Sequence, residues 1–335
     1  MTEKKKNAVD VLKTLKKKHE GNLMLLSGTG IQPVPTIPTG IMSLNSILSG
    51  VPNGGYARGR IVELLGVPSG GKTTIALQGL AETQAQGNVG AIIDAEHALD
   101  VDYAQRLGVR MDNLLLSQPD CGEQALEVAK DLVDVMGEGD LIVVDSVAAL
   151  TPRAEIEGEM GDEHIGRHAK MMSQAMRKLN AAMATNGVTV IFINQIRFKP
   201  MVTYGSPKTT PGGEALKFYA SQRIEVSTIS KVKITVGGKD EFVGNRTKIE
   251  VIKNKTFPPF RKVDTEIQYG KGIPRALDVL KLAEGKGVVQ KEGKSYLYRG
   301  GKLGVGFRQA WLYLEENPEM LGWLEEDVVK SYAVS

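Results

Sequence analysis

The sequence predicts an α/β protein with a mostly parallel sheet, extended by antiparallel strands. Between residues 60 and 194, apolar runs of strand length alternate with segments of helical periodicity, which is typical of parallel strands joined by crossover helices. From residue 222 to 273 the apolar pattern changes to period two, as in antiparallel strands. The composition shifts again after Gly272. We therefore expect three regions: a helical arm and linker (1–38), a large core (39–272) and a small α+β C-terminal domain (273–335).

The composition is that of an ordinary globular protein, with 41% apolar and 24% charged residues among 335. The single cysteine, Cys121, excludes an internal disulfide framework and suits a reducing cytosol. No apolar run has membrane-spanning length, and the lysine-rich start lacks an apolar signal core. We expect a cytoplasmic protein. The net charge of +3 conceals basic stretches at 1–20 and 286–308, which alone are weak indications of a polyanionic partner.

The N-terminal arm is expected to contain a short amphipathic helix within residues 7–20. Ala8, Val11, Leu12 and Leu15 have helical spacing, with lysines on the other face. Such a helix either lies on its own core or packs on a neighbouring subunit, and the sequence does not decide between the two. A linker rich in Gly, Thr and Pro follows at 27–38.

The core is expected to begin with a capped helix from Ile41. Its central strands are placed at 61–65, 89–94, 113–116, 141–145 and 188–194. The helices between them are placed after residue 71, at 102–107, around Leu126 to Val133, and at 165–184. Ligands of such sheets bind at the carboxyl ends of the strands. The polar residues at those ends are therefore the candidates for function.

Residues 66–74, reading G-V-P-S-G-G-K-T-T, lie between a candidate buried strand and a helix. That context makes the stretch a phosphate-binding loop and the domain a P-loop NTPase core. Glycines let the backbone N–H groups face the phosphates, Lys72 reaches the β and γ phosphates, and the Thr73 hydroxyl ligates Mg²⁺. The expected nucleotide contacts are Gly66, Val67, Pro68, Ser69, Gly70, Gly71, Lys72, Thr73 and Thr74.

Acidic residues at the strand ends are candidates for the chemistry. Asp145 ends L-I-V-V-D, from where a carboxylate can hold Mg²⁺ opposite a phosphate loop. Glu96 is the best candidate to deprotonate the attacking water, although the pattern alone does not choose among Glu96, Asp94 and Asp100. Gln195, after Asn194, can contact a γ-phosphate.

Two loops lie beside this site, at 157–166 and 196–213. The second is basic and has little apolar periodicity, and long loops of this kind are usually functional or disordered. Together they suit a site whose ATP state controls the grip on a polyanion. Lys253 and Lys255 follow a strand, and their default interpretation is solvated strand-end lysines. Tyr296 and Tyr298 lie in the basic C-terminal stretch, as nucleic-acid contacts or, more commonly, as core residues.

Seven motifs in order resemble the bacterial RecA recombinase family. They are the phosphate loop, D-A-E-H-A-L-D (94–100), L-L-x-S-Q-P-D-x-G-E-Q-A-L-E (114–127), V-V-D-S-V-A-A-L-T-P (143–152), M-M-S-Q-A-M-R-K-L (171–179), F-I-N-Q-I-R (192–197) and G-G-x-A-L-K-F-Y-A-S (212–221). The resemblance runs from about the N-terminal helix to Pro318. It implies an ATPase that polymerises on single-stranded DNA as a helical filament, pairs it with homologous duplex DNA and exchanges strands.

The resemblance also assigns residues. It implies that Lys72, Thr73 and Asp145 bind MgATP, that Glu96 is the general base and that Gln195 senses the γ-phosphate. Asp100 and Tyr103 would contact the adenine, and Lys253 and Lys255 would reach the γ-phosphate of a neighbouring subunit, which reverses their default interpretation. The implied DNA contacts are Glu157, Gly158, Glu159, Met160, Gly161, Ile165, Arg177, Ile196, Arg197, Lys199, Tyr204, Lys208, Thr209, Thr210, Gly212 and Gly213.

Some positions depart from the bacterial pattern. Val67-Pro68 and Gly70 replace the usual acid and serine, and Lys208 replaces an acid. The acidic tail of many relatives is absent. Those relatives also stimulate the self-cleavage of a repressor, which adds such a repressor to the expected partners.

Two other function classes remain open from the residues alone. A hexameric helicase with this core would form closed rings, and a regulatory ATP-binding protein would show no stimulation of hydrolysis by DNA.

Overall fold

The structure is a computed structural model that describes residues 7–16, 18, 34–159, 166–198, 207–236 and 239–333. The chain divides into two compact units, Met1–Val34 and Pro35–Ser335. In the first unit, helix α1 covers Ala8–Leu15, and the Asn7 side chain caps it by accepting a hydrogen bond from the Asp10 N–H. This helix lies within the predicted segment 7–20. None of its residues is buried.

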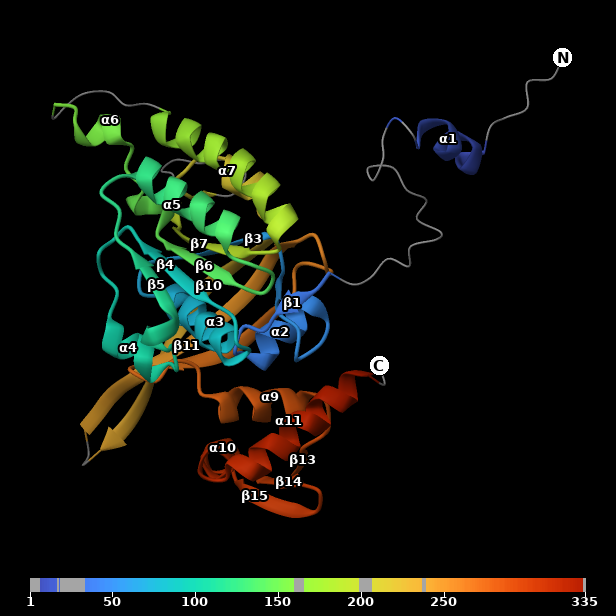
Figure 1. Cartoon of the computed structure of the whole chain (residues 1–335). Helices are drawn as coiled ribbons and strands as arrows, with labels where there is room; N and C mark the ends of the chain where they lie inside the picture. The colour runs from blue at the N-terminus through green and yellow to red at the C-terminus, as the bar shows by residue number, and fades with distance from the viewer. Residues whose placement is uncertain are drawn as a thin grey trace. The chain divides into compact units, whose positions relative to one another are not determined.

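The second unit is built on one large sheet (Figure 1). Among the described residues its strand order is β12-β11-β10-β3-β7-β6-β4-β5. The bounds are β3 Ile61–Gly66, β4 Gly90–Asp94, β5 Leu114–Ser117, β6 Leu141–Asp145, β7 Thr189–Gln195, β10 Gln222–Val236, β11 Lys239–Asn254 and β12 Lys262–Gln268. The strands from β10 to β5 pair in parallel, whereas β10, β11 and β12 pair antiparallel. The predicted fold class is confirmed.

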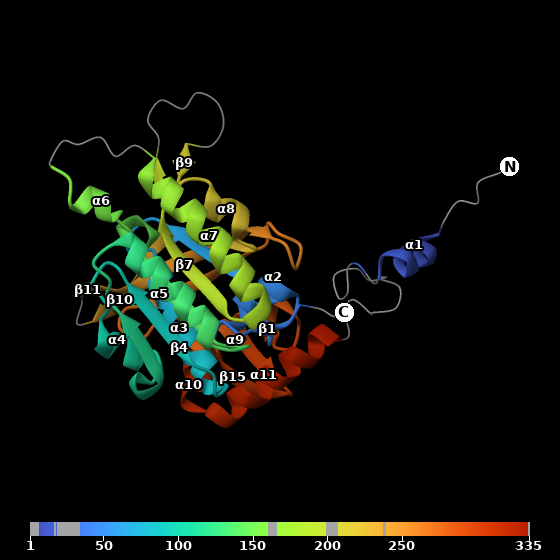
Figure 2. The same ribbon diagram turned by 45° about the horizontal axis from the view of Figure 1, so that its top comes forward.

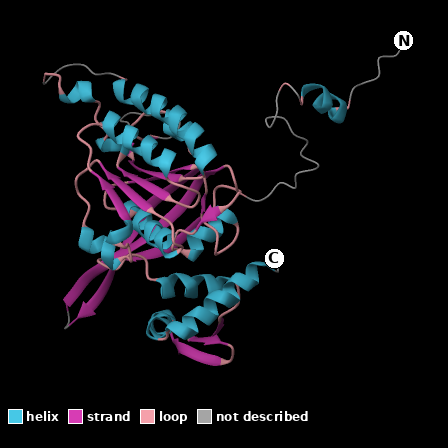
Figure 3. Cartoon of the chain, viewed as in Figure 1, coloured by secondary structure: helices cyan, strands magenta, loops and turns pink. Residues whose placement is uncertain are grey.

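Helices cover both faces of the sheet (Figures 1 and 3). Helices α2 (Met42–Ser49), α3 (Lys72–Ala85) and α4 (Val101–Arg106) lie on one face. On the other face lie α5 (Gly122–Val135), α7 (Arg167–Asn186) and α8 (Ala215–Tyr219). Short elements lie before or between these strands and helices: β1 Thr36–Ile37, β2 Tyr56–Ala57, η2 Met111–Asn113, η3 Val147–Ala149, α6 Arg153–Ile156, β8 Arg197–Phe198 and β9 Lys208–Thr209.

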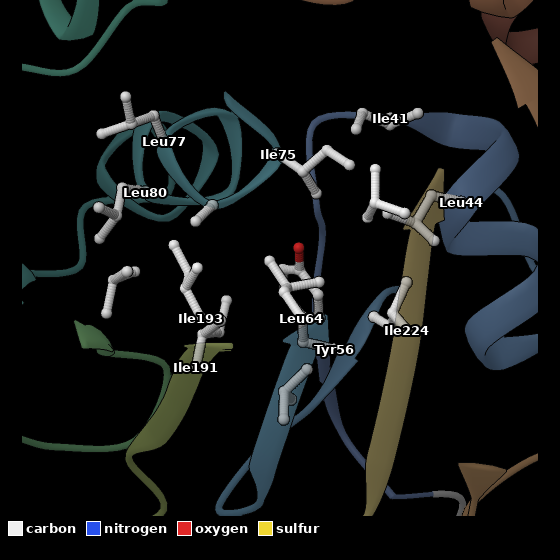
Figure 4. Close-up of a cluster of buried hydrophobic side chains, with 14 of the residues drawn as sticks. Ile41, Leu44, Tyr56, Leu64, Ile75, Leu77, Leu80, Ile191, Ile193 and Ile224 are labelled. Carbon is white, nitrogen blue, oxygen red and sulfur yellow. The ribbon is translucent and has the colours of Figure 1, made fainter. Parts of the chain in front are cut away.

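Strand β3 packs both of its faces, because successive side chains of a strand point to opposite sides. Leu64 joins the hydrophobic cluster under α3, whereas Ile61 joins the cluster under α5 and α7. Figure 4 shows Ile75 and Leu80 of α3 pointing toward the strand residues of the first cluster. The helix that follows the phosphate loop is therefore fixed to the strand that precedes it.

One stretch of the sheet differs from the expectation. The period-two pattern between residues 222 and 273 predicts R-I-E-V-S (223–227) and K-V-K-I-T-V (231–236) as separate strands, but both lie in the single strand β10. The pairing of β10 with β11 shifts between Thr228 and Ser230, so Ile229 interrupts the alternation. A period-two pattern broken by a bulge cannot be distinguished from two strands in the sequence. Beyond the pairing with β3, the β10–β11 hairpin extends past the edge of the other strands (Figure 1).

The C-terminal elements have a hydrophobic cluster of their own. They are α9 Arg275–Gly285, β13 Gln290–Glu292, β14 Ser295–Tyr298, β15 Gly301–Val305, α10 Phe307–Glu316 and α11 Pro318–Ala333. Tyr296 and Tyr298 are each only 4% exposed, so the structure favours their interpretation as core residues. The buried Asp278 of α9 accepts hydrogen bonds from the N–H and the hydroxyl of Ser43, and so joins these elements to α2.

The domain boundary at 272/273 stays a prediction. None of the helices in the described ranges is long and apolar enough to cross a membrane.

We predict that Leu64→Ala lowers the free energy of unfolding by about 2–5 kcal/mol, because the fully buried side chain would leave a cavity under α3. Urea denaturation should show a lower midpoint with an unchanged m-value. The matched control is Leu312→Ala on α10, where the side chain is 36% exposed, and its effect should stay within about 0.5 kcal/mol. Equal effects of the two substitutions would contradict the packing described for β3.

Candidate nucleotide-binding site

The phosphate loop connects the end of β3 with the start of α3. Two of its glycines are required by the backbone. A Cβ on Gly66 would lie 2.2 Å from the Val226 carbonyl oxygen. Gly71, which precedes the first helical residue Lys72, has a φ of 96°, a conformation that strains residues with a side chain. No side chain caps this helix, so its first N–H groups remain available for an anion.

Lys72 is the buried positive charge of the loop, with only 6% of its surface exposed. Its Nζ donates hydrogen bonds to the carbonyl oxygens of Gly66 (3.2 Å) and Val67 (2.8 Å). Burial lowers the pKa of Lys72, while the nearby charges of Asp145 and Glu96 raise it. A buried ammonium that has carbonyls as its hydrogen-bond partners is poised to exchange them for phosphate oxygens.

Thr73 and Asp145 lie together, although 72 positions separate them in the chain. The Thr73 hydroxyl donates to Oδ2 of Asp145 at 2.8 Å, at the carboxyl end of β6. Burial raises the pKa of Asp145 to about 6, against the lowering effect of the Thr73 hydrogen bond. A hydroxyl oxygen beside a carboxylate is a donor pair suited to Mg²⁺, which would also relieve the cost of burying the carboxylate. The residues therefore fit the expected ion.

The three acids that the sequence left open have different surroundings. Asp94 accepts hydrogen bonds from the N–H groups of Ala98 (3.3 Å) and Leu99 (3.1 Å) and from Nε2 of Gln118 (3.1 Å). Asp100 caps α4 by accepting the N–H of Tyr103. Both carboxylates therefore hold the loop between β4 and α4 in place.

Glu96 instead faces the ends of two other strands. Its Oε1 accepts hydrogen bonds from the hydroxyl of Ser146, just after β6, and from Nε2 of Gln195 at the end of β7, 3.3 Å away. It also lines a cavity of about 230 Å³ together with Thr73 and Asp145. Among the three acids, Glu96 is the one whose hydrogen bonds come from side chains at these strand ends. Ser146 is a site residue that the sequence reasoning missed, although it directly follows Asp145.

A second hollow, of about 400 Å³, lies along the outside of the phosphate loop. Tyr103 lines it, and its hydroxyl is 2.8 Å from Oγ1 of Thr74. The sequence reasoning also missed Arg106, Asn245 and Tyr269, which line the same hollow. The guanidinium of Arg106 lies 5.9 Å from the centre of the Tyr103 ring. Asn245 and Tyr269 come from β11 and the end of β12, and no sequence pattern indicates that these strands reach the loop.

Lys253 and Lys255 do not lie at the phosphate loop of their own chain. Their Nζ atoms donate to carbonyls at the end of α8: Lys253 to Lys217 (2.5 Å) and Phe218 (3.0 Å), and Lys255 to Phe218 (3.4 Å). The N–H of Lys255 bonds to Ser221, whose own N–H bonds to Ile61 at the start of β3. The phosphate loop leaves β3 five residues later, roughly 16 Å along the strand.

The candidate DNA contacts fall partly within the described residues. Residues 157–159 and Arg177 are exposed, and Met160, Gly161, Ile165, Lys199 and Tyr204 lie outside the described ranges. Backbone hydrogen bonds fix both ends of the second loop, residues 196–213, in place. The N–H of Ile196 bonds to the Gly66 carbonyl of the phosphate loop (3.1 Å), and Arg197 pairs with Thr209 across β8 and β9.

The exit of this loop lies against α7 (Figure 2). Cβ atoms on Gly212 and Gly213 would contact Val147 and Ala169, at 2.9 and 2.7 Å. Thr210 is buried, and Lys208 forms an ion pair with Glu225. The described ends of both loops therefore lie at the same end of the sheet as the phosphate loop.

Comparisons with known proteins identify relatives of the whole chain. The family model for the RecA N-terminal domain matches residues 6–274, and the one for the RecA C-terminal domain matches residues 277–333. The chain is 51% identical over 315 residues to Protein RecA of Syntrophobacter fumaroxidans, covering 93% of this chain and 89% of that protein. It is 48% identical over 333 residues to Protein RecA of Streptococcus mutans, covering 99% and 86%. A crystal structure of the RadB recombinase shares the fold, with a TM-score of 0.51 and 21% identity over 71% of this chain and 98% of that one.

We predict that Gly71→Ala abolishes nucleotide binding, because the new Cβ would strain the positive φ of 96° within the loop itself and displace the end of the Ile267 side chain. Gly87→Ala is the matched control. Gly87 also has a positive φ (86°), but nothing lies within 4 Å of its Cβ position. Titration with a fluorescent ATP analogue should detect no binding to the first variant and near-normal affinity for the second. Normal affinity in Gly71→Ala would contradict the geometry of the loop.

Proposed function

The chain belongs to the RecA family and acts in ATP-dependent DNA recombination and repair, and we propose that its ATP site is complete only between neighbouring chains. Its activity is DNA-dependent ATP hydrolysis. In our proposal the chain polymerises on single-stranded DNA as a helical filament, pairs it with homologous duplex DNA and exchanges strands. The observation that supports a shared ATP site is the position of Lys253 and Lys255. Both lie away from the phosphate loop of their own chain, beside the earlier part of β3.

Each residue near the loop has a role in this proposal. The N–H groups from Gly66 to Thr74 bind the phosphates, and Lys72 gives up its two carbonyl partners for the β and γ phosphates. Thr73 and Asp145 hold Mg²⁺, which neutralises charge on the phosphates when bound. Asp100 and Tyr103 contact the adenine, and Arg106 supports the Tyr103 ring.

Glu96 is the proposed general base. Its carboxylate is held by Ser146 and Gln195 and lines the same cavity as Thr73 and Asp145. From there it can orient a water molecule for attack on the γ-phosphate and accept its proton. The neighbouring acids are less suited to this role, because Asp94 and Asp100 already hold backbone N–H groups.

Gln195 links hydrolysis to DNA. It ends β7, and the next residue, Ile196, begins the second loop while bonding to the backbone of Gly66. A Gln195 side chain that turns from Glu96 to the γ-phosphate would pull on the start of that loop. ATP and DNA should then strengthen each other's binding by the same factor.

Lys253 and Lys255 are proposed to reach the γ-phosphate of the neighbouring chain. A site completed by a neighbour makes hydrolysis depend on assembly, because a free chain lacks the neighbour's lysines and would hydrolyse ATP slowly. The other assignments remain proposals of the same kind: DNA contacts from both loops and Arg177, a helical arm that docks on a neighbour, and a location in the cytoplasm. A self-cleaving repressor is proposed as a further partner.

The decisive experiment measures ATP hydrolysis with and without single-stranded DNA and images the same samples by electron microscopy. We expect strong stimulation by DNA together with open helical filaments. Closed rings would favour a hexameric helicase. Absence of both stimulation and filaments would rule out the recombinase mechanism and favour a regulatory ATP-binding protein.

We predict that Glu96→Gln lowers DNA-stimulated turnover by about 100-fold or more, because the amide cannot accept the proton from water. ATP binding and filament formation should persist, since the amide retains hydrogen-bonding atoms for Ser146 and Gln195. Glu127→Gln on the exposed side of α5 is the control and should hydrolyse ATP normally. Normal turnover in Glu96→Gln would exclude Glu96 as the base.

We predict that Lys255→Ala leaves ATP binding by the free chain intact but lowers DNA-stimulated turnover by roughly 100-fold, because the neighbour's phosphate loses a positive charge. Lys262→Ala, which removes an exposed lysine at the start of β12, is the matched control and should change neither quantity. Both are measured by nucleotide titration without DNA and by phosphate release with DNA. Full turnover in Lys255→Ala would refute the cross-chain role.

A further inference from the structure

A fully buried carboxylate, Glu63, lies in the middle of β3 with a partner on each neighbouring strand. Its Oε1 accepts a hydrogen bond from Nδ2 of Asn194 on β7 at 2.9 Å. Its Oε2 accepts one from Nε of Arg223 on β10 at 2.5 Å. The three side chains form a polar row across the adjacent strands β7, β3 and β10, and Glu63 has 0% exposure. Figure 1 shows these three strands within the large sheet.

The fold itself does not call for a charge at this position. On the same face of β3, Ile61 belongs to the hydrophobic cluster under α5 and α7, and Phe192, the residue opposite Glu63 on β7, belongs to it as well. A buried ion pair costs desolvation, and apolar residues of similar volume often serve stability equally well. This suggests that the row has a role in the reaction.

One end of the row lies at the chain's own ATP site. Asn194 directly precedes Gln195, and its Oδ1 accepts the Gln195 N–H at 2.9 Å. Its Nδ2 also donates to the carbonyl of Pro211, at the exit of the second DNA loop, at 3.3 Å. Gln195 in turn donates to Glu96. Glu63 therefore fixes the residue that holds both the γ-phosphate sensor and the end of the loop.

The other end lies at the lysines offered to a neighbour. Arg223 and Lys253 are directly opposite each other in the pairing of β10 with β11. Burial lowers the pKa of Lys253, as do the charges of Lys255 and Arg223, whereas the charge of Glu63 raises it. Without Glu63, the guanidinium of Arg223 would face the ammonium of Lys253 with its charge uncompensated. That repulsion would move Lys253 away from the α8 carbonyls.

We propose that Glu63 is a positioning residue: through Arg223 it places Lys253 for the ATP of the neighbouring chain, and through Asn194 it places Gln195 at the ATP of its own chain. One buried carboxylate then couples adjacent ATP sites along an assembly. This inference rests on the proposed cross-chain site, so its test must separate a failure of Glu63 from a failure of that site.

The test uses two variants that are each expected to have negligible turnover alone. Lys72→Ala lacks a working phosphate loop but still offers its lysines, and the double variant Lys253→Ala/Lys255→Ala offers no lysines but keeps its phosphate loop. An equimolar mixture on single-stranded DNA can hydrolyse ATP only where the first chain supplies lysines to the second. Absence of activity in this starting mixture would overturn the cross-chain site itself, and with it the role of Glu63.

Glu63→Gln is then added to one chain at a time. In the lysine-giving chain we expect it to lower the restored turnover about tenfold, because Lys253 is misplaced. In the other chain we expect a similar loss, because the amide has a single acceptor oxygen for the two donors Asn194 and Arg223, so Asn194 and with it Gln195 are no longer fixed at the working site. Unchanged turnover in either placement would overturn the proposal, since the carboxylate would then serve at most one site.

Two further variants guard against a folding defect. Glu250→Gln, in an ion pair with Lys248 on β11, is the matched control and should leave the restored turnover unchanged in both placements. Glu63→Asp retains the buried charge but is one methylene shorter, so it cannot reach Asn194 and Arg223 together. If Glu63→Gln does not fold, Glu63→Asp should show the same two losses. Normal turnover with Glu63→Asp in either chain would overturn the proposal equally.

Discussion

The parallel pairing of β3 with β7 and β10 is the constraint on which the rest of the site depends. Because these strands run in one direction, their carboxyl ends meet at one edge, which brings Gly66 beside Gln195 and Val226. The same register places Glu63 beside Arg223, and through it Lys253, several residues earlier. In the proposed mechanism this strand therefore separates the residues that bind the chain's own ATP from the lysines that would reach a neighbouring chain.

The site holds charges that are costly before ligand binds. Lys72 is buried with carbonyl partners, and the pKa of Asp145 is raised to about 6 by burial. Phosphates and Mg²⁺ bound at the proposed site would lower both costs, so part of the binding free energy would come from compensating charges that are already buried in the fold. Burial and the like charges of Lys255 and Arg223 also lower the pKa of Lys253, and in the proposal a neighbour's phosphate would compensate that buried charge.

The sheet strands, the helices and the phosphate loop could be predicted from the sequence, because strand periodicity, helix periodicity and glycine spacing depend only on residues that are close together in the chain. It failed where the answer depends on strand order. Nothing in the sequence indicates that Asp94 and Asp100 bind backbone N–H groups while Glu96 faces Ser146 and Gln195. Tyr269 and Asn245 reach the loop only through the pairing of β11 with β12. The bulge at Ile229 likewise made one strand resemble two.

The central claim is that one chain holds only part of an ATP site. The most direct test measures ATP turnover per DNA-bound chain on single-stranded oligonucleotides of increasing length, with binding quantified in the same samples. The account predicts negligible turnover on oligonucleotides too short to hold two chains, and a rise toward a plateau as the number of chain-to-chain contacts per bound chain approaches one. Full turnover by a single bound chain would contradict it.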